Sequence, residues 1–348
     1  EGDDYTGGLV GEMFNGKISS VTMDNITVNV TNANGGGIVG YSAAEITDSQ
    51  ANGSIEGGDV IGGLVGATEK KISNSHAKVT VTSTGDEVGG LVGKSDAEIT
   101  DSYSTGSVTG EEEVGGLVGD SSDIIDSYST STVEGVGEVG GLVGFTFNNI
   151  TDSYSTGNVT STEERTGGIV GSINSGSISN TYSTGDITGD TEVGGISGKS
   201  LGGNTSDSYV RGNINGSSKV GGIVGYNAST IENSYITGSV TGTQNTGAIV
   251  GQNGQNAGEV ALSSDPPADG VVQNIYWNSN TISETTVIGK EGGDSFDGTN
   301  GGDSIKQGEL TGLTTSEMQG STASSNMSAF DFTSVWTTSS GTYPTLQE

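Results

Sequence analysis

Apolar residues recur at fixed points along most of this chain, separated by glycines and small polar residues. The most regular point is the phrase Gly-Gly-(Leu/Ile)-Val-Gly, whose copies begin 25 to 29 residues apart. The ten copies, two of which carry Ser197 or Ala248 as variants, begin at Gly7, Gly36, Gly62, Gly89, Gly115, Gly140, Gly167, Gly194, Gly221 and Gly247. A period of about 20–50 residues is typical of repeat proteins, so the pattern predicts a stack of similar units.

A second phrase, Ile-x-Asp-Ser-Tyr-Ser-Thr-Gly-x-Val, lies between the glycine phrases, with clear copies at Ile99–Val108, Ile124–Val133 and Ile150–Val159. Each unit therefore holds three short apolar points bounded by turn-forming residues, which is typical of short strands. No segment shows a sustained helical period. We predict an all-β fold: a β-solenoid of about ten coils of about 26 residues, with three short strands per coil and a C-terminal cap.

Equivalent residues of a β-solenoid lie about 4.8 Å apart in successive coils and form ladders along the stack. One predicted ladder consists of tyrosines, namely Tyr103, Tyr128, Tyr154, Tyr182, Tyr209 and Tyr235. The single histidine, His76, falls in the same ladder, so we expect a structural substitution rather than a metal ligand or catalytic base. The serines that follow Asp recur in nearly every unit, and we expect them to be structural rather than nucleophilic.

Acidic and amide side chains form another predicted ladder: Asp48, Asn74, Asp101, Asp126, Asp152, Asn180, Asp207 and Asn233. Asp and Asn favour turns because their side chains bond to the nearby backbone, so we expect a turn here. A cation-binding stripe is the alternative, because like charges stacked at this distance repel by roughly 1 kcal/mol even in water. The glycine phrases fit either a close approach of two backbone segments or a tight corner with positive φ.

The phrases Gly89–Gly93 and Gly115–Gly119 match the Gly-Leu-(any)-Gly core of the GLUG-motif family, which the chain resembles over about residues 5–251. Proteins with such repeats are typically large secreted or surface-anchored adhesin-like proteins of bacteria and archaea, so the resemblance implies a secreted or cell-surface location. Some bacterial immunoglobulin A peptidases carry the repeats outside their catalytic domain. This chain has one His and no His-Glu-x-x-His motif, so we expect no peptidase activity.

The last part of the chain departs from the repeat, which divides the sequence into a solenoid at 1–260 and an irregular final coil with a capping segment at 261–348. Val272–Trp277 resembles the last, altered coil of GLUG arrays, and Leu313–Leu346 contains phrases that resemble their closing segment. The end of a solenoid exposes its core and an open strand edge, so we expect Trp277 and Trp336 to cover it. Ligand binding by either Trp is the alternative.

Charge is the feature of the composition that changes this picture most. The 348 residues include 43 acids and 11 bases, a net charge of −32 that is spread over the whole chain. Adaptation to high salt is one explanation, because salt screens the repulsion; an acidic secreted protein from an ordinary habitat is the other. Nucleic acid is not an expected partner without clustered Lys and Arg. No apolar run reaches about 18 residues, so we expect no membrane span, and without Cys there are no disulfides.

Two kinds of candidate site do not follow from the repeat pattern. The loop residues Asp294, Asp297, Asn300 and Asp303 offer the oxygen ligands that Ca²⁺ prefers, although a solvated loop without metal explains the same composition. Asn-x-Ser/Thr sequons are candidate N-glycosylation sites of a secreted protein. The nine sequons begin at Asn25, Asn29, Asn52, Asn149, Asn158, Asn204, Asn215, Asn227 and Asn326.

These features favour a non-enzymatic, extracellular structural protein: an adhesin-like rigid stalk or display surface that needs no cofactor. Its expected partners are other cell-surface components, glycans or copies of itself. One alternative is the protomer of a self-assembling extracellular filament, because Ile26–Thr31 alternates apolar and polar residues and could pair with another subunit. A second alternative is a polysaccharide-binding module, which needs exposed aromatic residues along one face. An enzyme is not expected, because no cluster of carboxylates and bases stands out from the repeat.

Overall fold

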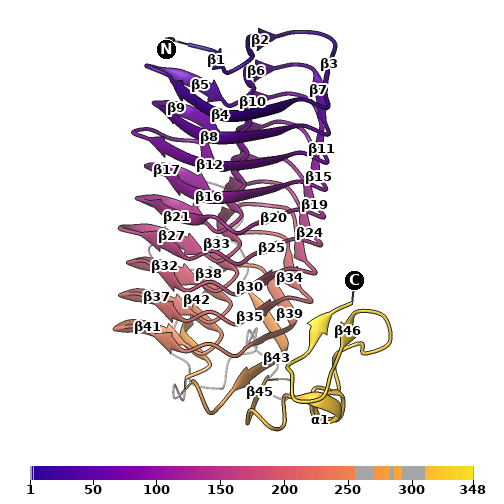
Figure 1. The fold of residues 1–348 in the computed structure, drawn as a ribbon. Helices are drawn as coiled ribbons and strands as arrows, with labels where there is room; N and C mark the ends of the chain where they lie inside the picture. Colours follow the sequence, from indigo (N-terminus) through magenta and orange to yellow (C-terminus); the bar gives the residue numbers. More distant parts are fainter. Residues whose placement is uncertain (1, 3, 255–269, 283–285, 292–309, 348) are drawn as a thin grey trace.

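The computed structural model describes residues 2, 4–254, 270–282, 286–291 and 310–347, and it confirms an all-β solenoid. Figure 1 shows an upright stack of coils that runs from the indigo N-terminal end to the orange coils, with the yellow C-terminal segment beside those coils. Every pairing between successive coils that the structure describes is parallel, which is the arrangement that a repeat wound around one axis must produce. Each coil has three sides.

The first face of the solenoid is a parallel sheet of ten strands, each of which ends at the first glycine of a Gly-Gly-Leu-Val-Gly phrase or its variant. Its strands are β1 (Thr6–Gly7), β5 (Ala33–Gly36), β9 (Asp59–Gly62), β13 (Val88–Gly89), β17 (Glu112–Gly115), β22 (Gly137–Gly140), β27 (Glu164–Gly167), β32 (Thr191–Gly194), β37 (Ser218–Gly221) and β41 (Gln244–Gly247).

The second face is a parallel sheet of eleven strands that begin at or near the Val of the same phrase. Its strands are β2 (Val10–Met13), β6 (Val39–Ser42), β10 (Val65–Thr68), β14 (Val92–Ser95), β18 (Val118–Ser121), β23 (Val143–Thr146), β28 (Val170–Ile173), β33 (Ser197–Ser200), β38 (Val224–Asn227), β42 (Val250–Asn253) and β44 (Ile288–Glu291). The first two faces thus meet at the Gly-Gly-Leu turn.

The third face carries the Ile-x-Asp-Ser-Tyr phrase and is broken into more strands than predicted. Its strands are β3 (Lys17–Ser19), β4 (Thr22–Asn29), β7 (Glu45–Thr47), β8 (Gln50–Gly57), β11 (Ile72–Ser73), β12 (His76–Ser83), β15 (Ile99–Thr100), β16 (Tyr103–Thr109), β19 (Ile124–Ile125), β20 (Tyr128–Ser129), β21 (Thr132–Gly135), β24 (Ile150–Thr151), β25 (Tyr154–Ser155), β26 (Val159–Ser161), β29 (Ile178–Ser179), β30 (Tyr182–Ser183), β31 (Ile187–Thr188), β34 (Asn204–Ser206), β35 (Tyr209–Val210), β36 (Ile214–Asn215), β39 (Thr230–Ile236), β40 (Val240–Thr241), β43 (Val271–Asn278) and β45 (Leu310–Leu313).

The backbone bends at the Asp/Asn ladder, and this bend is one reason why the coils contain more than the three strands that the sequence predicted. Asp101, Asp126 and Asn180 have φ of 50°, 49° and 52°, in the left-handed region that interrupts a strand. Asn and Asp tolerate this region better than other residues with a side chain, so the ladder makes turns as predicted. The backbone of the third face therefore bends at this position, and at Asp101, Asp126, Asp152 and Asn180 the bend separates two strands.

Serines close the backbone hydrogen bonding at this bend. Ser127 Oγ donates to the Ile125 carbonyl of its own coil at 2.8 Å and accepts the Ser102 N–H of the previous coil at 3.1 Å. Ser153 repeats the arrangement toward Ser127, and all three serines are buried. The Ser residues beside Asp are thus structural, because each hydroxyl satisfies a buried backbone group that the bend leaves unpaired.

The core is a narrow column of aliphatic side chains. Leu91, Leu117 and Leu142 are fully buried, as are the Ile residues that begin the third face, such as Ile99 and Ile124. The register pairs like with like along the column, for example Ile99 with Ile124. A thin core of this kind needs few apolar residues per coil, which reconciles an ordered fold with a chain that is 30% hydrophobic.

Close backbone approach, rather than positive φ, accounts for the glycine phrases. A Cβ built on Gly116 would overlap the Gly141 carbonyl oxygen of the next coil and would lie 3.0 Å from Ser129 Cβ. Gly116 itself does not have a left-handed φ. The corner between the first two faces therefore excludes any side chain, because the neighbouring coil occupies that space.

The closing residues pack against the last coils, including Tyr276 of β43, on the side that carries the tyrosine ladder. β43 and β45 continue the third face, and the chain then forms α1 (Gly320–Asn326) and the antiparallel pair β46 (Trp336–Thr337) and β47 (Thr345–Leu346). Figure 1 shows this yellow segment next to β39 and β43. Trp336 is fully buried there against the tyrosine ladder, whereas Trp277 packs against the aliphatic core. The aromatic residues on the flank of the solenoid thus form the surface against which the closing segment packs.

Candidate functional site

A row of charged side chains follows the corner where the first and second faces meet. The residue two positions before each glycine phrase has a left-handed backbone, with φ of 57° at Glu87 and 52° at Glu113. The residue directly after the phrase, such as Lys94 or Asp120, lies on the second face, in β14 or β18. Both positions place their side chains along the same edge of the solenoid.

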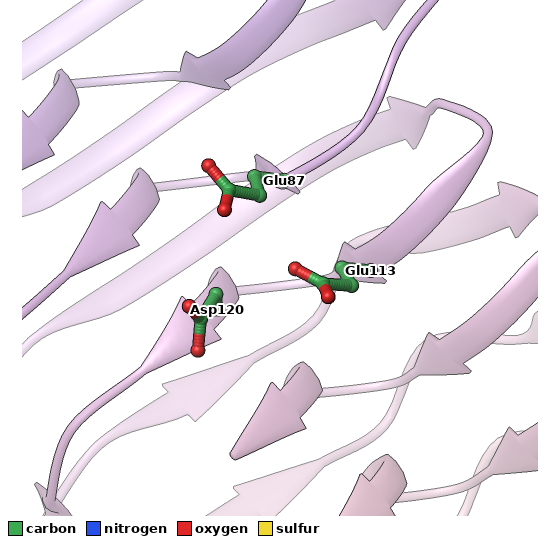
Figure 2. Close-up of side chains that lie close together, drawn as sticks. All are labelled: Glu87, Glu113 and Asp120. Carbon is green, nitrogen blue, oxygen red and sulfur yellow. The ribbon is translucent and has the colours of Figure 1, made fainter.

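Three carboxylates converge at one point of this edge. Glu87, Glu113 and Asp120 each offer a carboxylate oxygen within 4.8 Å of the others, and Figure 2 shows them coming from neighbouring strands. Such oxygen ligands suit a hard cation such as Ca²⁺. Lys94 Nζ, however, lies 2.6 Å from Glu87 Oε1 and 2.8 Å from Asp120 Oδ2, so an ammonium group of the chain already forms ion pairs with two of the three. The geometry is that of an ion-pair cluster.

The cluster changes the proton affinities of its members. Burial raises the pKa of Glu113 to about 7, and the charges of Asp120 and Glu87 add to the rise. Burial alone would lower the pKa of Lys94, but its hydrogen bonds to Asp120 and Glu87 raise it overall. At neutral pH the cluster can therefore exchange a proton at Glu113, while Lys94 stays charged.

Ion pairs continue along the same edge. Arg165 lies 2.5 Å from Glu138 and 2.8 Å from Glu164, and Lys219 lies 2.9 Å from Glu192. We call this row the charged seam; it consists of Glu87, Lys94, Glu113, Asp120, Glu138, Glu164, Arg165, Glu192 and Lys219. The seam links successive coils through opposite charges. Sequence reasoning missed it, although the positions flanking each glycine phrase carry the signal.

The tyrosine ladder on the third face is confirmed. Its rings stack with centroids 4.6 to 5.2 Å apart and nearly parallel planes. His76 stacks on Tyr103 at 4.6 Å, as expected for a ladder substitution, and burial lowers the pKa of His76. Because the rings cover each other's faces, only their edges point outward. The polysaccharide alternative needs open ring faces on which sugars stack, and the ladder does not present them along its length.

The closing segment covers one end of the ladder. Tyr209 and Tyr235 pack with Trp336, whose ring centroid lies 6.2 and 5.6 Å from theirs, and Phe330 stacks on Trp336 at 4.6 Å. Tyr235 is fully buried, whereas Tyr103, at the far end, is half-buried. The ladder thus has a covered part and an open part.

The structure describes some of the sites predicted from the sequence and not others. Asp294, Asp297, Asn300 and Asp303 lie outside the described residues. Seven sequon asparagines are exposed and Asn52 is half-buried, so they remain candidates for glycosylation. Asn227 is the exception and a correction, since it is fully buried and its amide donates to Ser229 O at 3.0 Å and Asn253 Oδ1 at 2.8 Å. A sequon does not indicate whether its Asn side chain points to solvent or to the core, because successive side chains of a strand point to opposite faces.

Comparison with known protein families identifies the repeat. The GLUG motif matches the chain three times, at residues 85–109, 135–160 and 216–241. Each match spans a glycine phrase and the Ile-x-Asp/Asn-Ser-Tyr phrase that follows it, the two segments that form the corner and the bend described above. Searches of curated proteins and of solved structures produced no match. Among the described residues, no helix has the length and apolar character to cross a membrane.

Proposed function

The chain is a GLUG-repeat protein, and from that premise we propose that it is a non-enzymatic, extracellular structural protein that acts as an adhesin-like stalk or display surface. The observation that carries the proposal is the unbroken parallel register of the first face, in which ten strands follow one another in the described chain. At about 4.8 Å per step, nine steps make a rod of roughly 43 Å.

Three features support a rigid rod. The serine hydroxyls, the stacked tyrosines and the charged seam each connect one coil to the next along a different edge or face. A repeat protein whose neighbours are coupled this strongly resists bending and local opening. The acidic surface keeps such a rod soluble and extended at the outside of a cell.

Location and adhesion can be tested on intact cells of the source organism. Antibodies against the solenoid should label unpermeabilised cells, and beads coated with the folded protein should bind to such cells. Beads coated with heat-unfolded protein serve as the matched control. Labelling that appears only after lysis, or equal binding by folded and unfolded protein, would contradict the proposal.

A filament protomer is the second candidate, favoured by the first coil. Strand β4 pairs with β8 on one side, and on its other side the described residues add only the bridge between Gly2 and Val30. Tyr5, Leu9 and Phe14 are 42%, 53% and 62% exposed at the same end. Open strand edges with apolar side chains favour pairing with another coil, here that of a second subunit.

Electron microscopy distinguishes a stalk from a filament. If subunits stack end to end, the native protein forms periodic fibres, and Leu9→Glu abolishes them by placing a charge in the contact. Phe147→Glu is the matched control, because Phe147 is 55% exposed but lies in the middle of the solenoid. Short single rods for the native protein would eliminate the filament and leave the stalk.

A further inference from the structure

Asn-Gly pairs are chemically reactive points of a polypeptide. The backbone nitrogen of the residue after an Asn can attack the side-chain amide carbon of that Asn, and a Gly at this position has no side chain to hinder the approach. The chain has six such pairs, and the sixth, Asn300-Gly301, lies outside the described residues. The five described pairs begin at Asn15, Asn34, Asn52, Asn215 and Asn253.

In four of the five pairs, the glycine is held within the stack of coils. Gly216 N donates to the next coil at 3.0 Å, and Gly254 N donates to the previous coil at 2.8 Å. Gly35 and Gly53 lie inside β5 and β8, each of which has a paired strand on both sides. The attacking nitrogen must lose its proton and move toward the side chain, so reaction at these sites requires local opening of the coil.

The pair Asn15-Gly16 lies in a different environment, in the bend between β2 and β3 of the first coil. Both residues are exposed, and neither makes a hydrogen bond within the described part of the chain. Gly16 has φ of 106°, a conformation that residues with a side chain rarely adopt. The bend therefore requires a glycine after Asn15 and leaves the nitrogen of that glycine free to react.

The sequence explains why this bend is held less firmly than its equivalents. In the next three coils the strand of the second face ends in Ser42, Thr68 or Ser95, and its side-chain oxygen accepts the backbone N–H two residues later at 3.2, 3.2 and 3.4 Å. Strand register places Met13, which has no hydroxyl, opposite Ser42. The first coil also has three residues between its strands at this point, whereas the second coil has two.

We propose that Asn15 is a site of spontaneous deamidation, at which the protein converts to aspartate and isoaspartate. Gly16 N forms a bond with Asn15 Cγ, the bond from Cγ to the side-chain nitrogen breaks, and ammonia leaves with the proton of Gly16. The product is a cyclic succinimide, and water opens its ring at either of the two carbonyl carbons. Water is the only co-reactant, so the reaction requires neither an enzyme nor a metal.

Conversion changes the first coil in two ways. It adds a negative charge directly after Phe14, which is 62% exposed, and the isoaspartyl product adds one carbon to the backbone of the bend. The first coil is thus the part of the described chain that this chemistry alters first. The inference goes beyond the proposed function, because the reaction needs no partner and takes place in a stalk and in a filament protomer alike.

Peptide mapping by mass spectrometry tests the proposal on protein from a host that does not N-glycosylate. The tryptic peptide of residues 1–17 suits this test, because Asn15 is its only side-chain amide. During incubation of the folded protein in mildly alkaline buffer, this peptide should gain aspartate and isoaspartate severalfold faster than the peptide with Asn215. Asn215 is the matched internal control, since it is exposed as well but Gly216 N is hydrogen-bonded. In urea-unfolded protein the two sites should convert at similar rates.

A variant confirms the source of the new acid. Asn15→Gln keeps an amide but lengthens the side chain by one carbon, which disfavours ring closure, so the peptide should keep its mass and the melting transition should not change. Equal rates at Asn15 and Asn215 in the folded protein would overturn the proposal, because exposure alone would then decide the rate. Conversion of Asn15 in unfolded protein but not in folded protein would overturn it as well.

Discussion

Replacement of Ser127 by Ala tests the physical basis of the bend on the third face. The Ser127 hydroxyl is 1% exposed, accepts the buried Ser102 N–H at 3.1 Å and donates to the Ile125 carbonyl at 2.8 Å. Alanine keeps the volume nearly constant and removes both bonds. The variant therefore isolates the contribution of one hydroxyl to the contact between two coils.

The two lost bonds do not have equal cost. The Ile125 carbonyl still accepts the Asp101 N–H at 3.3 Å, so it keeps a partner. The Ser102 N–H loses its acceptor inside the protein, and a buried donor without a partner costs about 1–3 kcal/mol. We expect Ser127→Ala to lower the free energy of unfolding by about 1–3 kcal/mol.

Urea denaturation measures this loss, and hydrogen exchange locates it, because the Ser102 amide should exchange faster in the variant. Ser107→Ala is the matched control: its Oγ lies at the surface, 3.5 Å from Thr80 Oγ1, and we expect a change within about 0.5 kcal/mol. Equal stability losses for the two variants, or an unchanged exchange rate at Ser102, would refute the account of the serine ladder.

Three further predictions concern the corner, the seam and the overall charge. Gly116→Val should prevent cooperative folding, because its side chain overlaps the next coil, and a normal melting transition would contradict the close approach. Glu113→Gln should stabilise the protein by about 1 kcal/mol near pH 8 and leave its stability unchanged near pH 4. Because the pKa of Glu113 is raised in the folded state, the native protein loses stability as pH rises from about 4.5 through about 7, and the variant does not. Melting curves at both pH values test this. The melting temperature should rise with NaCl between about 0.1 and 2 M, because salt screens a net charge of −32, and a flat or falling dependence would contradict that explanation.

The repeat made most of the fold predictable. Because equivalent residues must stack, the spacing alone placed Tyr103 on Tyr128 and His76 in the same column, and it separated structural serines such as Ser102 from nucleophiles. The turn role of Asp126 followed from the chemistry of its side chain. These predictions depended only on period and residue type.

Features that depend on orientation in three dimensions were not predictable in the same way. The seam joins Lys94 to Glu87 and Asp120, and only the left-handed backbone at Glu87 brings these side chains to one edge. The closing segment has no repeat partner, so its sequence shows aromatic residues but not that Trp336 packs on the flank of the ladder. The side chain of the sequon residue Asn227 faces inward, and a shift of one residue in strand register would turn it outward.

Disulfide trapping tests the central claim, the in-register stack of coils, most directly, because the chain has no Cys of its own. Register pairs Glu134 with Thr160 and Thr160 with Thr188 on the exposed side of the third face. Adjacent coils bring paired residues to about 4.8 Å, within the range for a disulfide, whereas residues two coils apart lie beyond it. The account predicts rapid oxidation of the Glu134→Cys/Thr160→Cys variant and none of Glu134→Cys/Thr188→Cys; equal cross-linking of both pairs would contradict it.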